Sequence, residues 1–531
     1  MPMSSLPVDC VTIILENLRY DPGCLFSCLL INRSWCRVTV PILWSDPFSI
    51  FGEKFGRNII RSYLICLDYE NKLNLIKNGI NISLSENPLF GYHKYLQFLE
   101  YELLNHLVRS WMIENEHFKY FDITLYEESS VSKHQFCLIM SILCKLFMEN
   151  CSIKSFRLSK SWRHLDIPDI SMFSSGNLGL TKTRELEICF TEDESIMPNT
   201  AKLLRLLSSL CTELRSLSII LPMTTELRDM SEFYDLFKAQ RNLKRFKLCW
   251  SRQIFDNFLR VMNSQVNPQI NTTLTSLQLH RIKLDNLSLD ALEFCSCLKT
   301  FKIINLCEDL TLTPQCLSSS FVYFFKSFYF WSNCNMSAQS TAAIIKKAGR
   351  SLQKLHLDLI TSDTVDAILN YCPNISILKI YNKDDNDNIN LCKLLSGMKG
   401  MKLKKLDLVF NSAFTSKLGR ILPLSLDSLT LLDVNPTFYK FLEEFLNGIQ
   451  AQLSSLTISF LGKCLPEILK VIRDYVKSKN VLKTLNFTSH PLRYMCEKEL
   501  NDILVMKQEL HENVNVLLDY SKDYYNLEMA A

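Results

Sequence analysis

The residue types that perform enzyme chemistry occur in this chain, but not in the spacings that catalysis needs. The 531 residues contain no G-x-S-x-G, no phosphate-binding G-x-x-x-x-G-K-[ST], no H-E-x-x-H and no G-x-G-x-x-G sequence. The run Asp384-Asp385-Asn386-Asp387 resembles part of a calcium loop, yet it lacks the glycine at position six and the glutamate at position twelve, so we interpret it as a turn. The sequence therefore predicts no catalytic centre, no metal site and no cofactor.

Cysteine is the other reactive residue type, with 20 copies. No C-x-x-C pair occurs, and the first ten residues lack the basic and apolar segments of a secretion signal. We therefore expect reduced thiols that behave as small buried hydrophobes. Three of them, Cys211, Cys295 and Cys372, stand three residues before an apolar position of the repeat described next, so repeat packing explains their placement.

The elements that position other side chains are set by a repeated pattern, apolar-x-x-apolar-x-apolar. From Ile153 onward its copies recur at intervals of about 23 to 31 residues, the spacing of units that each supply one strand and one helix. The fourteen copies begin at Phe118, Ile153, Thr183, Leu214, Leu243, Leu274, Leu298, Phe325, Leu352, Ile375, Leu403, Leu426, Leu453 and Leu482. The pattern resembles cysteine-containing leucine-rich repeats and predicts an α/β solenoid, or horseshoe, over residues 117–489.

The segments on either side of the repeats are expected to be helical. Residues 49–116 carry two apolar faces, one from Ile59 to Leu67 and one from Tyr92 to Leu107, and predict a helical linker in which His106 is packed. Residues 490–531 are polar with helical character, which suits a C-terminal helical cap. The net charge of +4 is too small to imply a polyanionic partner, and the longest apolar runs fall short of a membrane span.

Residues 1–48 predict three short helices. Pro7 and Asp9 suit the first turn of a helix whose apolar face continues through Leu15 and Leu18 until Asp21-Pro22-Gly23 interrupts it. A unit of about 40 residues is near the lower limit for independent folding. Part of its apolar surface is therefore expected to contact a partner.

This stretch contains the motifs Leu6-Pro7-Val8-Asp9, Ile14-Leu15 with Leu18, Arg33-Ser34-Trp35 and Leu43-Trp44. In these motifs it resembles the F-box, which binds a Skp-type adaptor in cullin ubiquitin ligases. Asn32, where the family often has Cys or Ser, and the longer first turn from Tyr20 to Cys24 depart from the pattern. The adaptor-binding residues that the resemblance implies are Leu6, Pro7, Ile14, Leu15, Leu29, Ile31, Trp35 and Trp44, although some of them must hold the helices together instead.

The F-box and the repeats together imply a non-catalytic, substrate-recognition subunit of a Skp–cullin–F-box ligase, cytoplasmic or nuclear. Its partners would be the adaptor, through it a cullin, and a protein client, with no nucleic acid and no membrane. Three alternatives remain open: residues 6–44 could be a helical cap on the next domain, the repeats could be a binding scaffold outside any ligase, or an enzyme could use an unusual fold.

The client is expected on the strand residues that alternate with the buried ones. These positions are basic in the middle of the chain, with aromatic residues nearby, and predict a band that binds an acidic or phosphorylated segment. The predicted client-binding residues are Arg245, Lys247, Lys302, Tyr329, Trp331, Lys354, Lys379 and Tyr381. The alternative is an ordinary solvated face, because lysine is common on exposed strand positions.

Overall fold

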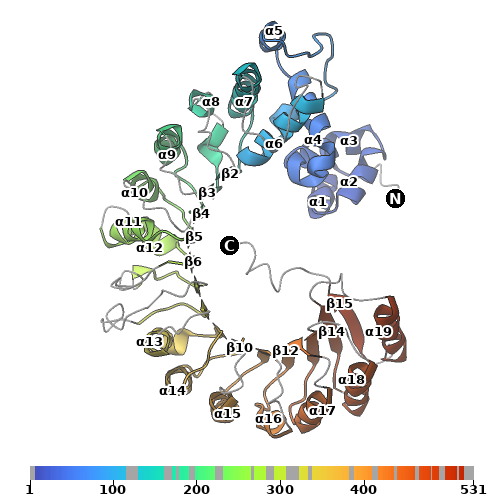
Figure 1. The fold of residues 1–531 in the computed structure, drawn as a ribbon, viewed down its shortest axis with the longest axis vertical. Coiled ribbons are helices and arrows are strands. Elements are labelled where there is room, and N and C mark those ends of the chain that lie inside the picture. Colours follow the sequence, from blue (N-terminus) through green and yellow to red (C-terminus); the bar gives the residue numbers. More distant parts are fainter. Residues whose placement is uncertain are drawn as a thin grey trace. The chain divides into compact units, whose positions relative to one another are not determined.

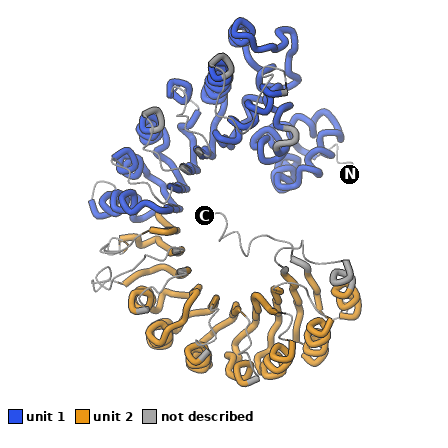
Figure 2. The backbone as a smooth tube through the Cα atoms, viewed as in Figure 1, with its two compact units in different colours: residues 1–273 blue, residues 274–531 orange. Residues whose placement is uncertain are grey.

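The structure is a computed structural model of the chain. It describes residues 6–519 apart from 115–129, 161–169, 175–178, 191–197, 222–230, 265–267, 283–291, 293, 306–321, 333–337, 382–387, 410–415, 436–438, 461–465, 480, 490–496 and 511–513. The chain divides into two compact units, Met1–Thr273 and Leu274–Ala531 (Figure 2). Each is described below by itself.

The first unit begins with helices and continues as strand–helix repeats (Figure 1). Its helical start consists of α1 (Val8–Asn17), α2 (Pro22–Leu29), α3 (Arg33–Leu43), α4 (Pro47–Ile65), α5 (Tyr69–Lys77) and the short η2 (Tyr92–Lys94). The repeats contain β1 (Phe98–Glu100), α6 (Tyr101–Glu114), α7 (Ser130–Asn150), β2 (Ser155–Lys160), α8 (Ser171–Ser174), η3 (Gly179–Lys182), β3 (Glu185–Phe190), α9 (Pro198–Leu210), β4 (Ser216–Ile220), α10 (Ser231–Lys238), β5 (Arg245–Cys249), α11 (Arg252–Asn263) and α12 (Pro268–Thr273).

Short polar side chains start the helices at the N-terminus. The Asp21 carboxylate accepts a hydrogen bond from the Cys24 backbone N–H, and the Asn32 amide oxygen accepts one from that of Trp35 at 2.9 Å. Both satisfy N–H groups that a helix leaves without an internal partner. Asn32, the departure from the F-box pattern, is therefore the N-cap of α3.

Helices α1 to α3 share a small core of their own. Its buried members are Val11, Leu15, Leu25, Cys28, Trp35, Ile42 and Leu43, and Leu18, Leu29, Val38, Trp44, Ile50 and Phe51 pack against it. These residues recur at the three-and-four spacing that places them on one side of each helix. The three expected helices therefore form, and hydrophobic burial holds them together.

The strands of the first unit form a parallel sheet in chain order, from β1 to β5. The sheet starts earlier than expected, because β1 lies inside the predicted helical linker and pairs with β2. Leu96, Leu99 and Tyr101 fit the repeat pattern and are buried. They also fit a helix face, since both templates place apolar residues three apart. The prediction of one helical face from Tyr92 to Leu107 is therefore wrong, and His106 is exposed on α6 rather than packed.

The second unit consists of strands and helices, which alternate from β8 to β15. Its strands are β6 (Ser276–His280), β7 (Thr300–Asn305), β8 (Ser327–Ser332), β9 (Lys354–Leu357), β10 (Ile377–Ile380), β11 (Lys405–Val409), β12 (Ser428–Val434), β13 (Ser455–Phe460), β14 (Thr484–Ser489) and β15 (Asn515–Asp519). Its helices are α13 (Ala338–Ala348), η6 (Gly349–Ser351), α14 (Ser362–Tyr371), α15 (Asn388–Gly397), η8 (Met398–Gly400), α16 (Ser416–Ile421), α17 (Tyr439–Gly448), α18 (Pro466–Ser478) and α19 (Glu497–Leu510). Each strand pairs in parallel with the next one along the chain.

The repeat pattern predicts the strands. Thirteen of the fourteen copies, those from Ile153 to Leu482, coincide with β2 to β14, and the copy at Phe118 lies outside the described residues. The helical-cap prediction for residues 490–531 differs from the structure, because α19 is followed by the strand β15. Its buried apolar positions Val514 and Val516 do not complete the repeat pattern, so the pattern does not predict this strand.

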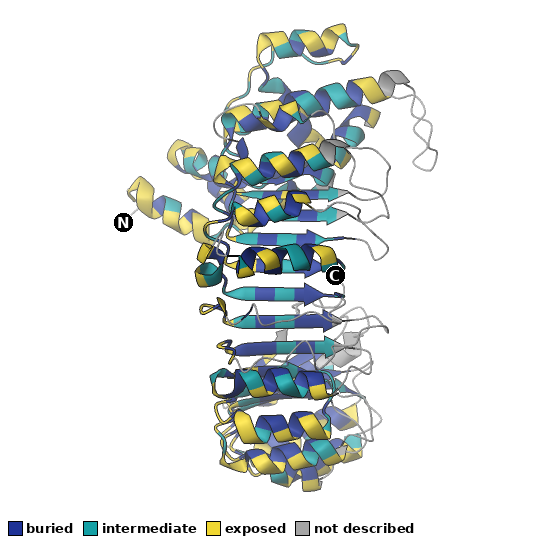
Figure 3. Ribbon diagram, turned by 90° about the vertical axis from the view of Figure 1, so that its left-hand side faces the viewer, coloured by how far each residue is buried: buried dark blue, intermediate teal, exposed yellow. Residues whose placement is uncertain are grey.

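Each strand has a buried side and a strand face. In β9, Leu355 and Leu357 are fully buried, whereas Lys354 and His356 alternate with them. The helices lie on the buried side of each unit's sheet (Figure 1) and are themselves buried on one side and exposed on the other (Figure 3). The opposite side of each sheet, the strand face, is therefore the surface on which side chains from successive repeats are arranged.

Candidate functional site

The N-terminal helices expose a set of large apolar residues, here called the helical patch. Its members are Leu6 (38% exposed), Val8 (57%), Ile13 (64%), Ile14 (40%), Phe26 (41%), Leu30 (87%) and Ile31 (46%). Exposing so many apolar side chains in a unit of this size is unfavourable unless a partner covers them. The helical patch is therefore a candidate protein-binding surface.

The structure divides the eight predicted adaptor-binding residues. Leu6, Pro7, Ile14 and Ile31 are exposed, and Leu15 and Trp35 are inside the three-helix core. Leu29 is half-buried against that core. Trp44 is also half-buried and packs on Tyr92, with ring centroids 4.3 Å apart, so it joins the helices to the segment that follows. Only the exposed group is available to a partner, and the sequence alone did not separate the two groups.

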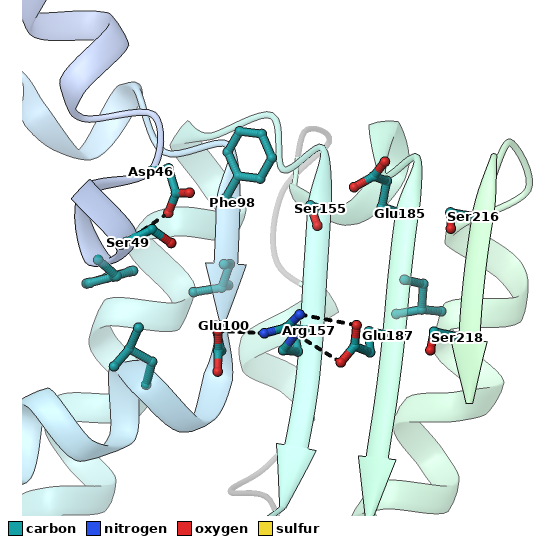
Figure 4. Close-up of a pocket in the computed structure, with 14 residues that line it drawn as sticks. Asp46, Ser49, Phe98, Glu100, Ser155, Arg157, Glu185, Glu187, Ser216 and Ser218 are labelled. Carbon is teal, nitrogen blue, oxygen red and sulfur yellow. Dashed lines mark hydrogen bonds and ion pairs between the residues drawn. The ribbon is translucent and has the colours of Figure 1, made fainter. Parts of the chain in front are cut away.

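The strand face of the first unit carries ion pairs between neighbouring strands. Arg157 on β2 contacts Glu100 on β1 (3.3 Å) and Glu187 on β3 (3.1 Å), as Figure 4 shows. Two residues earlier in the register, Arg245 on β5 reaches across β4 and pairs with Glu185 on β3 at 2.9 Å. Arg245 is one of the predicted client-binding residues, but a neighbouring carboxylate already compensates its charge.

A pocket of about 250 Å³ opens at this face, where the start of α4 meets the first strands. Its charged lining consists of Asp46, Glu100, Glu185 and Glu187 with Arg157, and its serines are Ser49, Ser155, Ser216 and Ser218 (Figure 4). Burial raises the pKa of Asp46, which is the N-cap of α4. Each of these carboxylates already has a partner, in an ion pair or as a helix cap. The pocket therefore has little uncompensated negative charge for a ligand.

The strand face of the second unit differs in charge. The register places Lys302, Tyr329, His356, Lys379 and Asp407 in one row across β7 to β11. Lys354 and Lys405 lie two residues earlier on β9 and β11. Trp331 on β8 and Tyr381, just after β10, complete the set. These nine residues are called the strand-face cluster.

Aromatic rings of the strand-face cluster contact each other and one of its lysines. Tyr329 and His356 lie with ring centroids 3.9 Å apart, and the Lys302 ammonium is 4.6 Å from the centre of the Tyr329 ring. Trp331 and Tyr381 form a second pair at 4.8 Å. A cation over a ring face and tilted ring pairs are both favourable geometries, so these side chains support each other.

Asp407 is the acidic member of the cluster and is fully buried. Its carboxylate lies 2.8 Å from the Lys379 ammonium and 3.9 Å from that of Lys405. A carboxylate removed from water needs a counter-ion, so Asp407 fixes Lys379, whose side chain is only 19% exposed. Lys379 is therefore less available to a client than the sequence suggested.

His356 lies at the centre of the lysines. Burial lowers its pKa to about 2, and Lys379, Lys302, Lys354 and Lys405 add to the effect in that order. The imidazole is therefore neutral at physiological pH, because a further positive charge would be repelled by four ammonium groups. His356, Lys405 and Asp407 were not among the predicted site residues; the signal for them was their position in the same strand rows.

The residues of the predicted client-binding band are divided between the strand faces of the two units. Arg245 and Lys247 belong to the first unit, on β5, and the other six predicted residues belong to the strand-face cluster of the second. Of those six, two pairs are in contact: Lys302 with the Tyr329 ring, and Trp331 with Tyr381. Lys354 is exposed at the edge of this group.

Buried thiols line the repeat interiors. Burial raises the pKa of Cys211, Cys295 and Cys372 to about 12. The Cys211 and Cys372 thiols lie near the backbone carbonyls of Leu180 (3.4 Å) and Ile345 (3.6 Å), in the preceding repeats. Thiols with such pKa values are poor nucleophiles, so these side chains act in packing.

Among the residues described, no group of three or more His, Cys, Asp or Glu is arranged to hold a metal ion. None of the described helices combines the length and apolar character that crossing a bilayer requires.

Comparison with known proteins gave little. No family model matches the chain, and no curated protein matches it. A solved structure that it resembles is that of the Toll–Spatzle complex, described as a molecular hub in Drosophila development and innate immunity. The two chains are 11% identical with a TM-score of 0.19, and the match covers 66% of this chain and 58% of that one. At this score the likeness carries no argument, and the chain spans less than two thirds of the other's length.

Proposed function

We propose that this protein is the substrate-recognition subunit of a Skp–cullin–F-box ubiquitin ligase, with leucine-rich repeats as its client-binding part. The helical patch would bind the Skp-type adaptor, and through it a cullin, while the strand faces would bind a protein client. The observation that carries the proposal is the helical patch itself. Three of the residues that the F-box resemblance assigns to adaptor binding, Leu6, Ile14 and Ile31, are exposed apolar side chains beside helices that already possess a core.

The proposal explains why the patch residues are apolar although they do not fold the helices. Adaptor binding by apolar contact removes these side chains from water. This burial is favourable by about 25 cal/mol of free energy for each Å² of apolar surface. In this function the chain is not an enzyme, and the ubiquitin transfer is performed by other subunits. The protein would act in the cytoplasm or nucleus.

The test uses the full-length chain and a purified Skp-type adaptor. Replacing Ile14 and Leu30 with Asp should abolish binding in a calorimetric titration, because two charges would be buried without partners. Both side chains are exposed, so the variant should keep the native circular dichroism and thermal midpoint. The matched control is Leu424→Asp, at an exposed leucine of the second unit that should leave adaptor binding unchanged. A native chain that shows no affinity for any Skp-type adaptor would sink the proposal.

The second candidate is a repeat scaffold that binds a protein outside any ligase. The strand-face cluster supports it equally, because a binding surface does not depend on the adaptor. Adaptor binding separates the two: a folded chain that binds its client but no adaptor would favour the scaffold.

A further inference from the structure

The strand-face cluster has an excess of positive charge. Strands β7 to β11 contain Lys302, Lys354, Lys379 and Lys405 but only one acidic residue, Asp407, and Asp358 follows directly after β9. Asp407 is buried and held between Lys379 and Lys405. Four ammonium groups against two carboxylates leave a net charge of +2, concentrated within five strands.

The positive charges of the four lysines lie around one side chain, His356. The four lysines come from β7, β9, β10 and β11, and all of them act on the single imidazole of His356. Keeping like charges close together costs free energy, since each raises the potential at the others. A bound anion would remove that cost, and the neutral imidazole could offer it an N–H donor.

Apolar contact is available beside the charge. Trp331 and Tyr381 are half-buried and lie against each other at 4.8 Å, one alternation further along their strands than the row of Tyr329 and Lys379. Paired aromatic side chains beside cations provide both an anchor and a specificity element for a peptide.

We propose that the strand-face cluster binds an acidic, extended segment of a partner protein. Its carboxylates would lie among Lys302, Lys354 and Lys405, and an aromatic side chain would rest on Trp331 and Tyr381. Neighbouring strands are about 4.8 Å apart, so β7 to β11 span about 19 Å, which an extended segment crosses in about six residues. The lysines are spread over this distance, which suits several carboxylates better than one phosphate.

This inference specifies the client of the proposed function. It rests on the proposed function only where it identifies the partner as a ligase client. A nucleic acid is less suitable, because its backbone carries charge over a much longer track than five strands and the chain as a whole has a net charge of only +4. The partner is therefore defined by acidic peptide chemistry.

The experiment measures fluorescence anisotropy of labelled probes with the full-length chain at low salt. The probe is an eight-residue peptide of Asp and Glu with one central Phe. Comparison probes are the same peptide with Lys for every acid, a neutral peptide with one phosphoserine, and an oligothymidylate of equal length. The test variant is Lys302→Ser, Lys354→Ser and Lys405→Ser together, which leaves the Lys379–Asp407 pair in place.

The matched control is Lys299→Ser, Lys326→Ser and Lys404→Ser. These exposed lysines come directly before β7, β8 and β11, so the control removes the same charge next to the same strands. We expect the test variant to bind the acidic peptide at least about tenfold more weakly with a smaller salt dependence, since three charge-assisted contacts are lost. The control should bind within about twofold of the native chain.

Three results would overturn the inference: no binding of the acidic peptide by the native chain, equal weakening by the test and control variants, or preference for the phosphoserine peptide or the oligothymidylate. Adaptor binding is measured in the same variants. If the native chain binds the acidic peptide but no adaptor, the inference stands and the proposed function fails. If it binds the adaptor but not the peptide, the reverse holds.

Discussion

The strand faces of the two units use charge in opposite ways. In the first unit, cations and carboxylates alternate from strand to strand, so that Arg157 lies between Glu100 and Glu187, and Arg245 pairs with Glu185. In the second unit, the lysines of β7 to β11 gather around His356, and the one carboxylate of these five strands, Asp407, is buried beneath them. The first face is neutralised by its own neighbours, whereas the second keeps a surplus.

The difference shows that parallel strands with the same local pattern can carry either a face whose charges are paired or a face with an excess of positive charge. An exposed ion pair between strands contributes little to stability but removes net charge from the face. Clustered like charges lower the stability of the folded state, and binding a ligand of opposite charge offsets this repulsion. Substitutions at Asp407, His356 and Arg157 test this contrast.

The largest effect is expected at Asp407. Replacing Asp407 with Asn removes the buried counter-ion of Lys379 and leaves that ammonium among like charges, so we expect the free energy of unfolding to fall by about 3 kcal/mol. Urea unfolding followed by circular dichroism gives this change, and hydrogen exchange should localise it to β10 and β11. The control is Glu187→Gln on the first face, with an expected loss below about 1 kcal/mol. Equal losses would mean that the two faces do not differ in this way.

The second effect is a pH dependence that belongs to His356. Its pKa is lowered in the folded chain to about 2, whereas an unfolded histidine has about 6.5. Below pH 6.5 the unfolded state therefore binds a proton that the folded state does not, and stability falls as the pH decreases. From pH 7 to pH 5 the loss is about 2 kcal/mol.

A His356→Gln variant should lose this part of the pH dependence, because glutamine does not titrate. Comparing the urea midpoints of the two proteins at pH 7 and pH 5 gives the difference directly. In the native chain, the His356 imidazole signal in NMR should not titrate between pH 5 and pH 8. A normal titration near pH 6.5 would contradict the convergence of the lysines on this ring.

The smallest effect is expected at Arg157. Its side chain is 48% exposed, and so its two pairs are screened by water and salt. Arg157→Met should lower the free energy of unfolding by less than about 1 kcal/mol, and 0.5 M NaCl should reduce the difference further. A loss as large as that of Asp407→Asn would show that the first face depends on its ion pairs.

The sequence predicted the repeats well because their signal is local. Residues such as Leu352, Leu355 and Leu357 are three and two positions apart, and all three are fully buried. Strand β1 was missed because Leu96 and Leu99 also fit a helix, and a three-residue strand contains too few alternations to decide. In β15 the repeat pattern is incomplete, so pairing with β14 alone defines the strand.

The candidate sites were less predictable than the fold because they depend on neighbours distant in sequence. Lys379 and Asp407 are brought together by strand register, which no local pattern encodes. The same holds for Arg157 and Glu187. At the N-terminus the motif positions were evident, but the division between core residues such as Trp35 and exposed residues such as Ile31 required the packing of three helices.

Chain-order pairing has a consequence for how such a surface can change over generations. Within each unit every strand pairs only with the strands immediately before and after it in sequence, so duplicating or deleting one whole repeat creates a single new junction in the sheet and preserves all others. The strand-face residue of a repeat, such as Tyr329 or Lys379, can be replaced without altering the buried apolar residues that flank it. A lineage can therefore lengthen or rewrite this face one repeat at a time while its interior stays the same.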